Sequence, residues 1–238
     1  MTTNESGSER NNTVNRDRAR LIVGIVLLGS VWGIFECTLG GFNATMGGVD
    51  ISMGAVLAGL FGLGFMALAM RTFNLRGAAL GIAVVAGIMR YFAPVGSFVL
   101  CSAIAIVAEG VIFEFIMSRP QFSLATSTMK DPRGLSYLGV IMAYIIFVTG
   151  YITTQVLTPV LGSDSGSVFD VVSVLPIIFG AGFFAALLGG VSLPLVVLAP
   201  QLDIDVTAVK KELYYGLSTG TSVFCWALLV VIYYPGML

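Results

Sequence analysis

The chain contains no histidine, only three cysteines and few charged residues, and each scarcity removes a class of chemistry. Without histidine there is no bis-histidine haem site, no histidine-based zinc or copper site and no imidazole proton shuttle. Cys37, Cys101 and Cys225 form no CxxC pair, so disulfide, iron–sulfur and thiolate–metal frameworks have no support. We expect all three cysteines to be packing residues, and we expect neither a metal nor a cofactor.

Recognisable catalytic motifs are also lacking. The sequence has no GxxxxGK[ST] phosphate loop, no HExxH and no GxSxG, which are the patterns of ATP hydrolysis, zinc proteolysis and serine hydrolysis. We therefore expect a protein that is not an enzyme and has no nucleic-acid partner. Energy for any transport would come from a gradient or from a partner.

Apolar residues, in contrast, are abundant. Hydrophobic residues make up 57% of the 238 residues and charged residues only 11%, and the mean hydropathy is +0.95. Such a chain has lipid as its main solvent, and its apolar runs are near the roughly 20 residues that cross a bilayer as a helix. We predict an all-α, polytopic transmembrane bundle of about six to seven helices. The runs cover residues 21–42, 51–70, 77–93, 98–117, 135–158, 171–198 and 217–235.

The polar segment 1–20 has no apolar run, and we predict a disordered cytoplasmic tail followed by a single membrane domain over 21–238. Basic residues fall before the first run and in alternate connections, whereas the other connections carry acids and no Lys or Arg. The positive-inside rule therefore predicts a cytoplasmic N-terminus and an external C-terminus in the cell membrane. The basic residues are Arg10, Arg16, Arg18, Arg20, Arg71, Arg76, Arg119, Lys130, Arg133, Lys210 and Lys211.

Glu36 interrupts the first apolar run, and small residues show which way it faces. Gly29, Gly33, Glu36 and Gly40 fall on one face of a helix. Small residues at four-residue spacing let helix backbones approach closely in lipid. The same pattern occurs at Gly77 and Gly81, and at Gly182, Ala186 and Gly190. We predict that these stripes are packing faces and that Glu36 points into the bundle.

Two further ionisable residues follow the same logic. Arg90 ends a stripe of alanines in the third run, and Glu109 shares a face with Ser102 and Ala105 in the fourth. A charge near the bilayer centre costs about 2.5 to 3.5 kcal/mol on insertion scales, so each needs a partner, a wet cavity or a proton. Arg90 is the one basic residue within the runs, so whichever acid it partners, a second acid is in excess.

These residues allow two interpretations. In the first, Glu36 and Arg90 form a structural bridge while Glu109 is protonated or bonds to Ser102 or a hydroxyl of the last helix. In the second, which we favour, Glu36, Arg90 and Glu109 line a pocket open to the outside that suits a cationic or amine-bearing ligand, or a proton. The glycine-rich segment around Asn43 could then fold over it as a lid, or it could be a mobile loop.

The stretches SVWGIFECTLGG, ALAMRTFNLRG, MRYFAP and CSAIAIVAEGVIFEF together resemble the substrate-binding, or S, components of energy-coupling factor (ECF) transporters, over about residues 21–117. The resemblance implies a small-molecule substrate such as a vitamin, a transmembrane coupling subunit and cytoplasmic ATPases as partners. It also implies that Glu36, Asn43, Arg90 and Glu109 surround the substrate. S components usually have six helices with both termini cytoplasmic, and their metal-binding members use an N-terminal histidine motif that this chain lacks, which disfavours a metal.

Two other functions stay open. The chain could be a non-transporting structural subunit of a larger membrane complex, in which charges and glycine stripes fix the register of helices. It could also be an autonomous proton-coupled carrier that uses Glu109, although the two halves show no inverted repeat.

Overall fold

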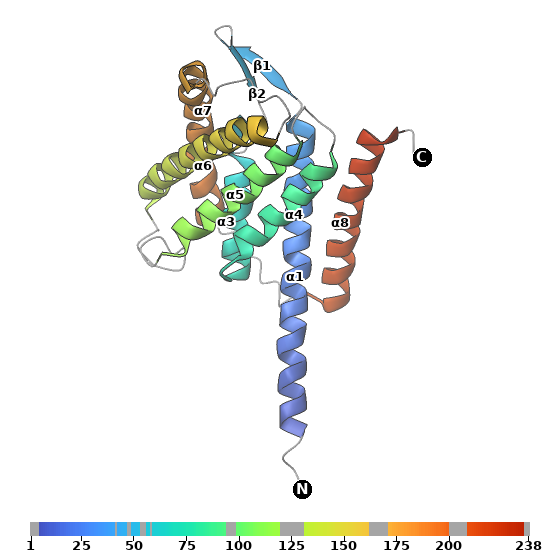
Figure 1. Cartoon of the computed structure of the whole chain (residues 1–238). Coiled ribbons are helices and arrows are strands. Elements are labelled where there is room, and N and C mark those ends of the chain that lie inside the picture. The colour runs from blue at the N-terminus through green and yellow to red at the C-terminus, as the bar shows by residue number, and fades with distance from the viewer. Residues whose placement is uncertain are drawn as a thin grey trace.

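The structure is a computed structural model that describes residues 5–40, 42–46, 49–52, 56–57, 59–93, 99–119, 131–161, 171–199 and 209–235. These residues form seven helices and one two-stranded hairpin (Figure 1). In chain order the elements are α1 (Glu5–Leu39), β1 (Asn43–Met46), β2 (Val49–Ser52), α3 (Phe61–Phe73), α4 (Ala78–Phe92), α5 (Val99–Met117), α6 (Pro132–Leu161), α7 (Val171–Leu198) and α8 (Lys211–Tyr233).

Five of these helices are long and apolar enough to cross a membrane, namely α1, α5, α6, α7 and α8. The apolar helices α3 and α4 are shorter, with 13 and 15 residues, or about 20 and 22 Å at 1.5 Å per residue. A hydrocarbon core is about 30 Å thick, so these two helices are short for a full crossing. The chain is a multi-pass helical membrane protein, which confirms the predicted fold class.

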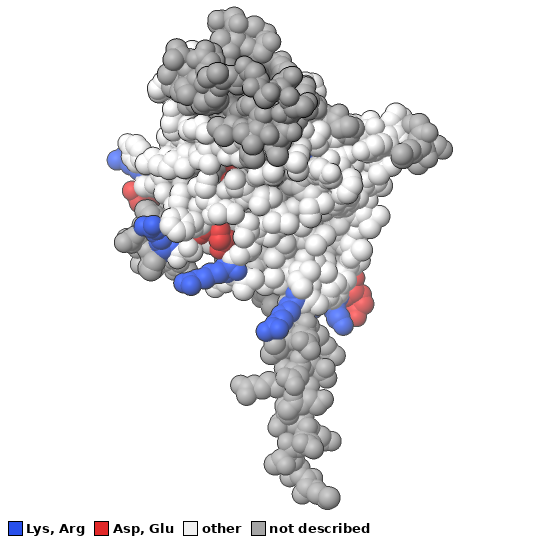
Figure 2. All heavy atoms as spheres, viewed as in Figure 1, with Lys and Arg blue, Asp and Glu red and all other residues white. Residues whose placement is uncertain are grey.

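Successive helices run in alternate directions, which gives the bundle two distinct ends (Figure 1). At one end, which we call the basic end, the Tyr214 hydroxyl donates to the Arg20 carbonyl and Arg71 reaches the last carbonyls of α7. Lys and Arg side chains gather around the lower part of the face in Figure 2, below a largely uncharged band. At the opposite end, the hairpin end, β1 and β2 lie beyond the last turn of α1.

Helix α4 packs along α1 through the predicted glycine stripe. A Cβ atom on Gly29 would lie 2.6 Å from Val85 Cβ, and one on Gly33 would lie 2.9 Å from Met89 Cβ. Neither position has room for a side chain, so the two backbones approach as closely as small residues allow. The prediction that this face of α1 points into the bundle is confirmed.

Helices α6 and α7 meet in the same way. A Cβ on Gly189 would lie 2.3 Å from Ala143 Cβ, and one on Gly182 would lie 2.9 Å from the Tyr144 ring. Helix α7 continues through Pro194 as far as Leu198, so the sixth apolar run is one helix. Within α7 the Ser192 hydroxyl donates to the Leu60 carbonyl at 2.6 Å, which connects α7 to the segment before α3.

Three expectations differ from the structure. Residues 51–70 were predicted to be one helix, but Val49–Ser52 is a strand and α3 begins only at Phe61. Val49 and Ile51 alternate with Asp50 and Ser52, and this period of two is typical of a strand. Asn43 pairs with Ser52 and Met46 with Val49 in the antiparallel register.

The N-terminal segment differs too, because α1 begins at Glu5 and includes most of the predicted disordered tail. Elongating an existing helix adds one hydrogen bond for each residue fixed, so the packed part of α1 can extend into polar sequence. The third difference is Gly77. It does not pack like Gly81 but precedes α4 with a φ of +90° and no atom within 4 Å of an added Cβ, a conformation that favours glycine.

Candidate functional site

Glu36 lies in the last turns of α1, one turn after Trp32, whose indole NH donates to the Glu36 Oε1 atom at 3.0 Å. The Trp32 ring is fully buried, and a Cβ on Gly62 of α3 would lie 3.1 Å from it. A buried indole NH needs an acceptor, and the carboxylate four residues later supplies one. The Trp32 and Gly62 contact therefore fixes the position of Glu36 between α1 and α3.

Arg90 comes to the same place from the last turn of α4 and is only 7% exposed. A Cβ on Gly40, just beyond α1, would lie 3.9 Å from the guanidinium carbon of Arg90. The charge of Arg90 lies close enough to Glu36 for the two to interact electrostatically. A cation in a last helical turn also complements the negative end of the helix dipole, which gives Arg90 a second reason to be stable there.

Glu109 approaches from α5 and is 8% exposed. It faces α6, because a Cβ on Gly150 would lie 3.1 Å from Glu109 Oε1. Its charge interacts with that of Glu36, whereas Glu109 Oε2 is buried and accepts no hydrogen bond from any described residue. The predicted bond to Ser102 or to a hydroxyl of the last helix is therefore wrong within the described residues, and Glu109 lies against a glycine of α6 instead.

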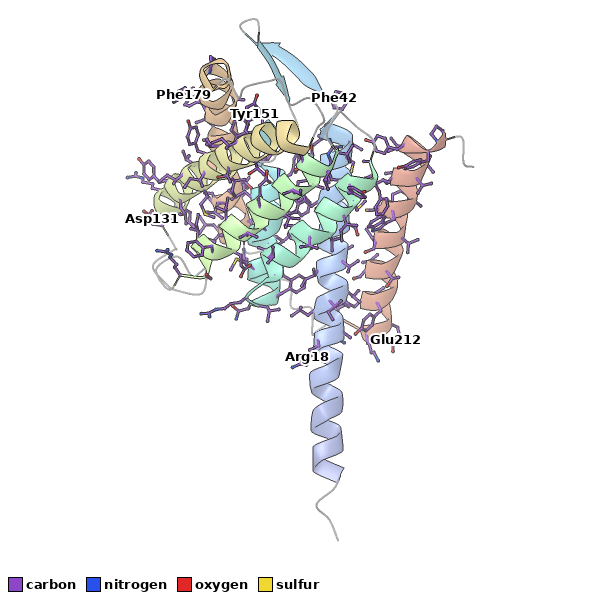
Figure 3. All side chains as sticks on the ribbon, in the orientation of Figure 1. Arg18, Phe42, Asp131, Tyr151, Phe179 and Glu212 are labelled. Carbon is purple, nitrogen blue, oxygen red and sulfur yellow. The ribbon has the colours of Figure 1, made fainter. Side chains whose placement is uncertain are left out.

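Asn43 is the fourth predicted site residue and opens strand β1, opposite Ser52. It follows Gly40, which abuts Arg90, by three residues. The side chain of Asn43 lies outside the described residues, so the structure places its backbone at the hairpin end and no more. Figure 3 labels Phe42, just before it, and Tyr151, next to Gly150, and both lie toward this end of the bundle.

The sequence prediction that three charged side chains face inward is thus confirmed. Glu36 and Arg90 lie in the last turns of α1 and α4, at the hairpin end, and Glu109 lies midway along α5. Glu36 interacts electrostatically with each of the other two, and we call the three residues the charge cluster. It contains two acids and one base. A buried acid without a cation, metal or hydrogen-bond donor is costly, so the cluster as described has the capacity to take one more donor or positive charge.

Glu114, five residues after Glu109 on α5, lies outside the charge cluster and has a structural role. Its Oε1 atom accepts a hydrogen bond of 2.7 Å from the Gly77 NH, at the start of α4. A carboxylate at a helix N-terminus satisfies an otherwise unbonded NH and complements the positive end of the dipole. Glu114 therefore fixes the basic end of α4 to α5.

Arg71 caps a helix C-terminus at the same end of the bundle. Its structural role was not recognised from the sequence. Its Nη1 atom donates to the carbonyls of Val196, Val197 and Ala199, at the end of α7. A cation at the C-terminus of a helix satisfies its last carbonyls. The partners are more than 120 residues apart in the chain, so no local pattern signals the contact.

Two cavities between described residues lie away from the charge cluster. One has a volume of about 520 Å³ and lies between α1 and α8, and the other, of about 480 Å³, lies between α6 and α7 near Pro194. The hydroxyls of Thr219 and Ser222 border the first cavity. They do not contribute to the charge cluster, in which Glu109 faces Gly150 of α6.

Comparison of the chain with protein-family profiles, with curated proteins and with solved structures found no match.

Proposed function

We propose that this chain is the membrane-embedded, substrate-binding subunit of a small-molecule uptake transporter, similar to an S component of ECF transporters and energised by separate ATPase partners. The observation that carries the proposal is the convergence of Glu36, Arg90 and Glu109 with a buried, unbonded Glu109 oxygen. Intramembrane ionisable residues that face the interior are typical of substrate and ion pathways. Packing alone does not require a second acid there.

The charge balance indicates the class of substrate. Two carboxylates and one guanidinium suit a small, vitamin-like molecule that carries an amine or another cationic group. The cationic group would approach the acids, with Glu109 Oε2 as an available acceptor. The hairpin that begins at Asn43 would cover the substrate, and by the positive-inside rule this end would face the outside of the cell membrane.

Native mass spectrometry of the gently solubilised protein tests the proposal, because it detects both a bound small molecule and a partner subunit. We expect wild type to retain a molecule of a few hundred daltons, and Glu36→Gln and Glu109→Gln to lose it. Glu114→Gln is the matched control, since it makes the same change in the same helix as Glu109 but outside the charge cluster. We also expect co-purification with a transmembrane coupling subunit and ATPase subunits.

Two alternatives give different results in the same experiment. A structural subunit would bind no small molecule, and its charge variants would shed neighbouring membrane subunits instead. The contacts of Trp32 with Gly62 of α3 and of Gly40 with Arg90 of α4 favour this reading as the second candidate, because they connect α1 to its neighbours. A proton-coupled carrier would bind substrate without ATPase partners and would need Glu109 for coupling.

A further inference from the structure

Helix α8 is attached to the bundle mainly along α1, and near the hairpin end Trp226 also contacts Phe92 of α4. Three side chains of α8 bond to α1 at successive levels: Tyr214 OH donates to the Arg20 carbonyl at 2.9 Å, Trp226 Nε1 to Ser30 Oγ at 3.2 Å and Tyr233 OH to the Cys37 carbonyl at 2.6 Å. Only 22% of the α8 span is buried. The two helices run parallel and in fixed register, but they leave space open on one side of their contact.

On one side of this contact lies the cavity of about 520 Å³, an open groove with an almost wholly apolar lining. Its walls include Ile22 and Val26 from α1 and Val223, Trp226 and Val230 from α8. From Thr219 to Val230 the groove runs about 17 Å along the helix, at 1.5 Å per residue. One leaflet of a bilayer contributes about 15 Å of hydrocarbon, so the groove has the length of one extended acyl chain.

The lower end of the groove opens at the basic end of the bundle. Figure 3 shows Arg18 and Glu212 there, at the foot of the contact between α1 and α8. Arg18, Lys210 and Lys211 are exposed, and Arg20 is partly buried beside them. Glu212, also exposed, opposes an anion at this position, but among the side chains that the structure describes here four basic residues outnumber this one acid. Such a basic site between transmembrane helices suits an anionic lipid headgroup.

We propose that the groove between α1 and α8 binds an anionic phospholipid of the surrounding bilayer, with one acyl chain against Ile22, Val26 and Val223 and the phosphate near Arg18 and Lys211. The apolar groove alone would accept any chain, and the basic residues alone would attract any anion. Because the basic residues lie where the apolar groove ends, at the depth of a headgroup, the site selects a molecule that has both an acyl chain and an anionic headgroup. The bound lipid fills the space that α8 leaves open and so completes the contact of α8 with α1.

Native mass spectrometry of the full chain in micelles tests this site, with phosphatidylglycerol and phosphatidylcholine of identical acyl chains added in equal amounts. Two basic residues near a headgroup are together worth roughly a 30-fold preference. We expect wild type to retain phosphatidylglycerol in preference by about that factor and the Arg18→Gln/Lys211→Gln double variant to lose the preference. The Arg119→Gln/Arg133→Gln variant removes two charges from the same end but away from α8, and should keep the preference within about twofold.

A second pair of variants tests the apolar part of the site. Ala227 borders the groove, and Ala227→Phe should fill it and reduce retention of both lipids at least fivefold. Val231, on the same helix, is 52% exposed and does not border the groove, so Val231→Phe should leave retention unchanged. A size-exclusion profile like that of wild type shows that each variant is folded.

Three results would overturn the proposal. Equal retention of the two lipids would show that the basic residues select nothing, and loss of the preference in both double variants would show an effect of general surface charge. A dimer that Ala227→Phe disrupts would identify the groove as a contact between protein chains. None of these results bears on the charge cluster. The lipid site and the proposed function are therefore tested independently.

Discussion

The two ends of the bundle use buried charge in different ways. At the basic end Glu114 accepts a hydrogen bond from the start of α4, and Arg71 donates to three carbonyls at the end of α7. Each of these charges is matched to the helix terminus that its sign complements. At the hairpin end Arg90 matches a helix terminus in the same way, but Glu36 and Glu109 do not.

This difference distinguishes charged side chains that stabilise the fold from charged side chains that the fold does not require. Removing a matched charge leaves backbone groups unsatisfied, which costs stability. Removing an acid that accepts no hydrogen bond relieves repulsion and costs little, whereas Glu36 accepts the bond from the buried Trp32 indole. An acid that the fold does not need is a candidate for binding something else. Glu109 and Glu114 each have one buried oxygen that bonds to no described residue, but Glu114 caps α4 through its other oxygen, so Glu109 fits this description best.

The largest effect is expected for Arg90→Gln in protein stripped of small molecules. The substitution leaves Glu36 and Glu109 without their base, and removal of one partner from a buried charge pair typically costs about 3 to 5 kcal/mol. Thermal unfolding followed by intrinsic fluorescence should show a melting temperature about 10 °C lower. Arg76→Gln, at an exposed arginine, is the control and should melt like wild type. A melting temperature within about 2 °C of wild type for Arg90→Gln would show that Arg90 does not stabilise the buried acids.

Arg71→Ala comes next, with an expected loss of about 2 to 3 kcal/mol, because hydrogen bonds from a charged donor to three carbonyls are lost together. Arg71→Lys keeps the charge but not the planar fork, and should fall between the alanine variant and wild type. The same unfolding measurement ranks the three proteins. If lysine were no better than alanine, charge at the end of α7 would not matter.

Glu114→Ala should cost about 1 to 2 kcal/mol, the usual loss when a helix N-terminus loses its capping acceptor. Glu114→Gln keeps an oxygen that can accept from the Gly77 NH, so it should retain most of the stability. Hydrogen exchange of the first turn of α4 locates the effect. Faster exchange elsewhere but not in this turn would contradict the cap.

The smallest effect on stability is expected for Glu109→Gln. In stripped protein its melting temperature should lie within about 2 °C of wild type or above it, because the change removes excess negative charge at almost constant volume. A fall comparable to that of Glu114→Ala would show that Glu109 supports the fold. Glu109 and Glu114 would then have the same role in stabilising the fold.

Sequence analysis could place the three charged residues on inward faces because small residues mark the packed side of a helix in lipid. Gly29 and Gly33 are neighbours of Glu36 on one helix face, and the structure packs that face on α4. The direction of a side chain is a property of its own helix, and so the local sequence determines it. Which helix lies opposite is a property of the whole fold.

For that reason the neighbour of Glu109 could not be predicted. Gly150 is 41 positions later in the chain, and nothing near Glu109 indicates that α6 would present a glycine there. The contact of Arg71 with the end of α7 is equally non-local. The strand at Val49–Ser52 is a different case: its alternation was visible, but in an apolar context that also suits a helix, and the hairpin partner β1 decided between them.

One measurement tests the central claim most directly. Small molecules extracted from purified wild type are added back to stripped wild type, Glu109→Gln and Glu114→Gln, and the melting temperature of each is followed. We expect the extract to stabilise wild type and Glu114→Gln but not Glu109→Gln, since only Glu109 belongs to the charge cluster. Equal stabilisation of all three proteins, or of none, would contradict a ligand site at the hairpin end.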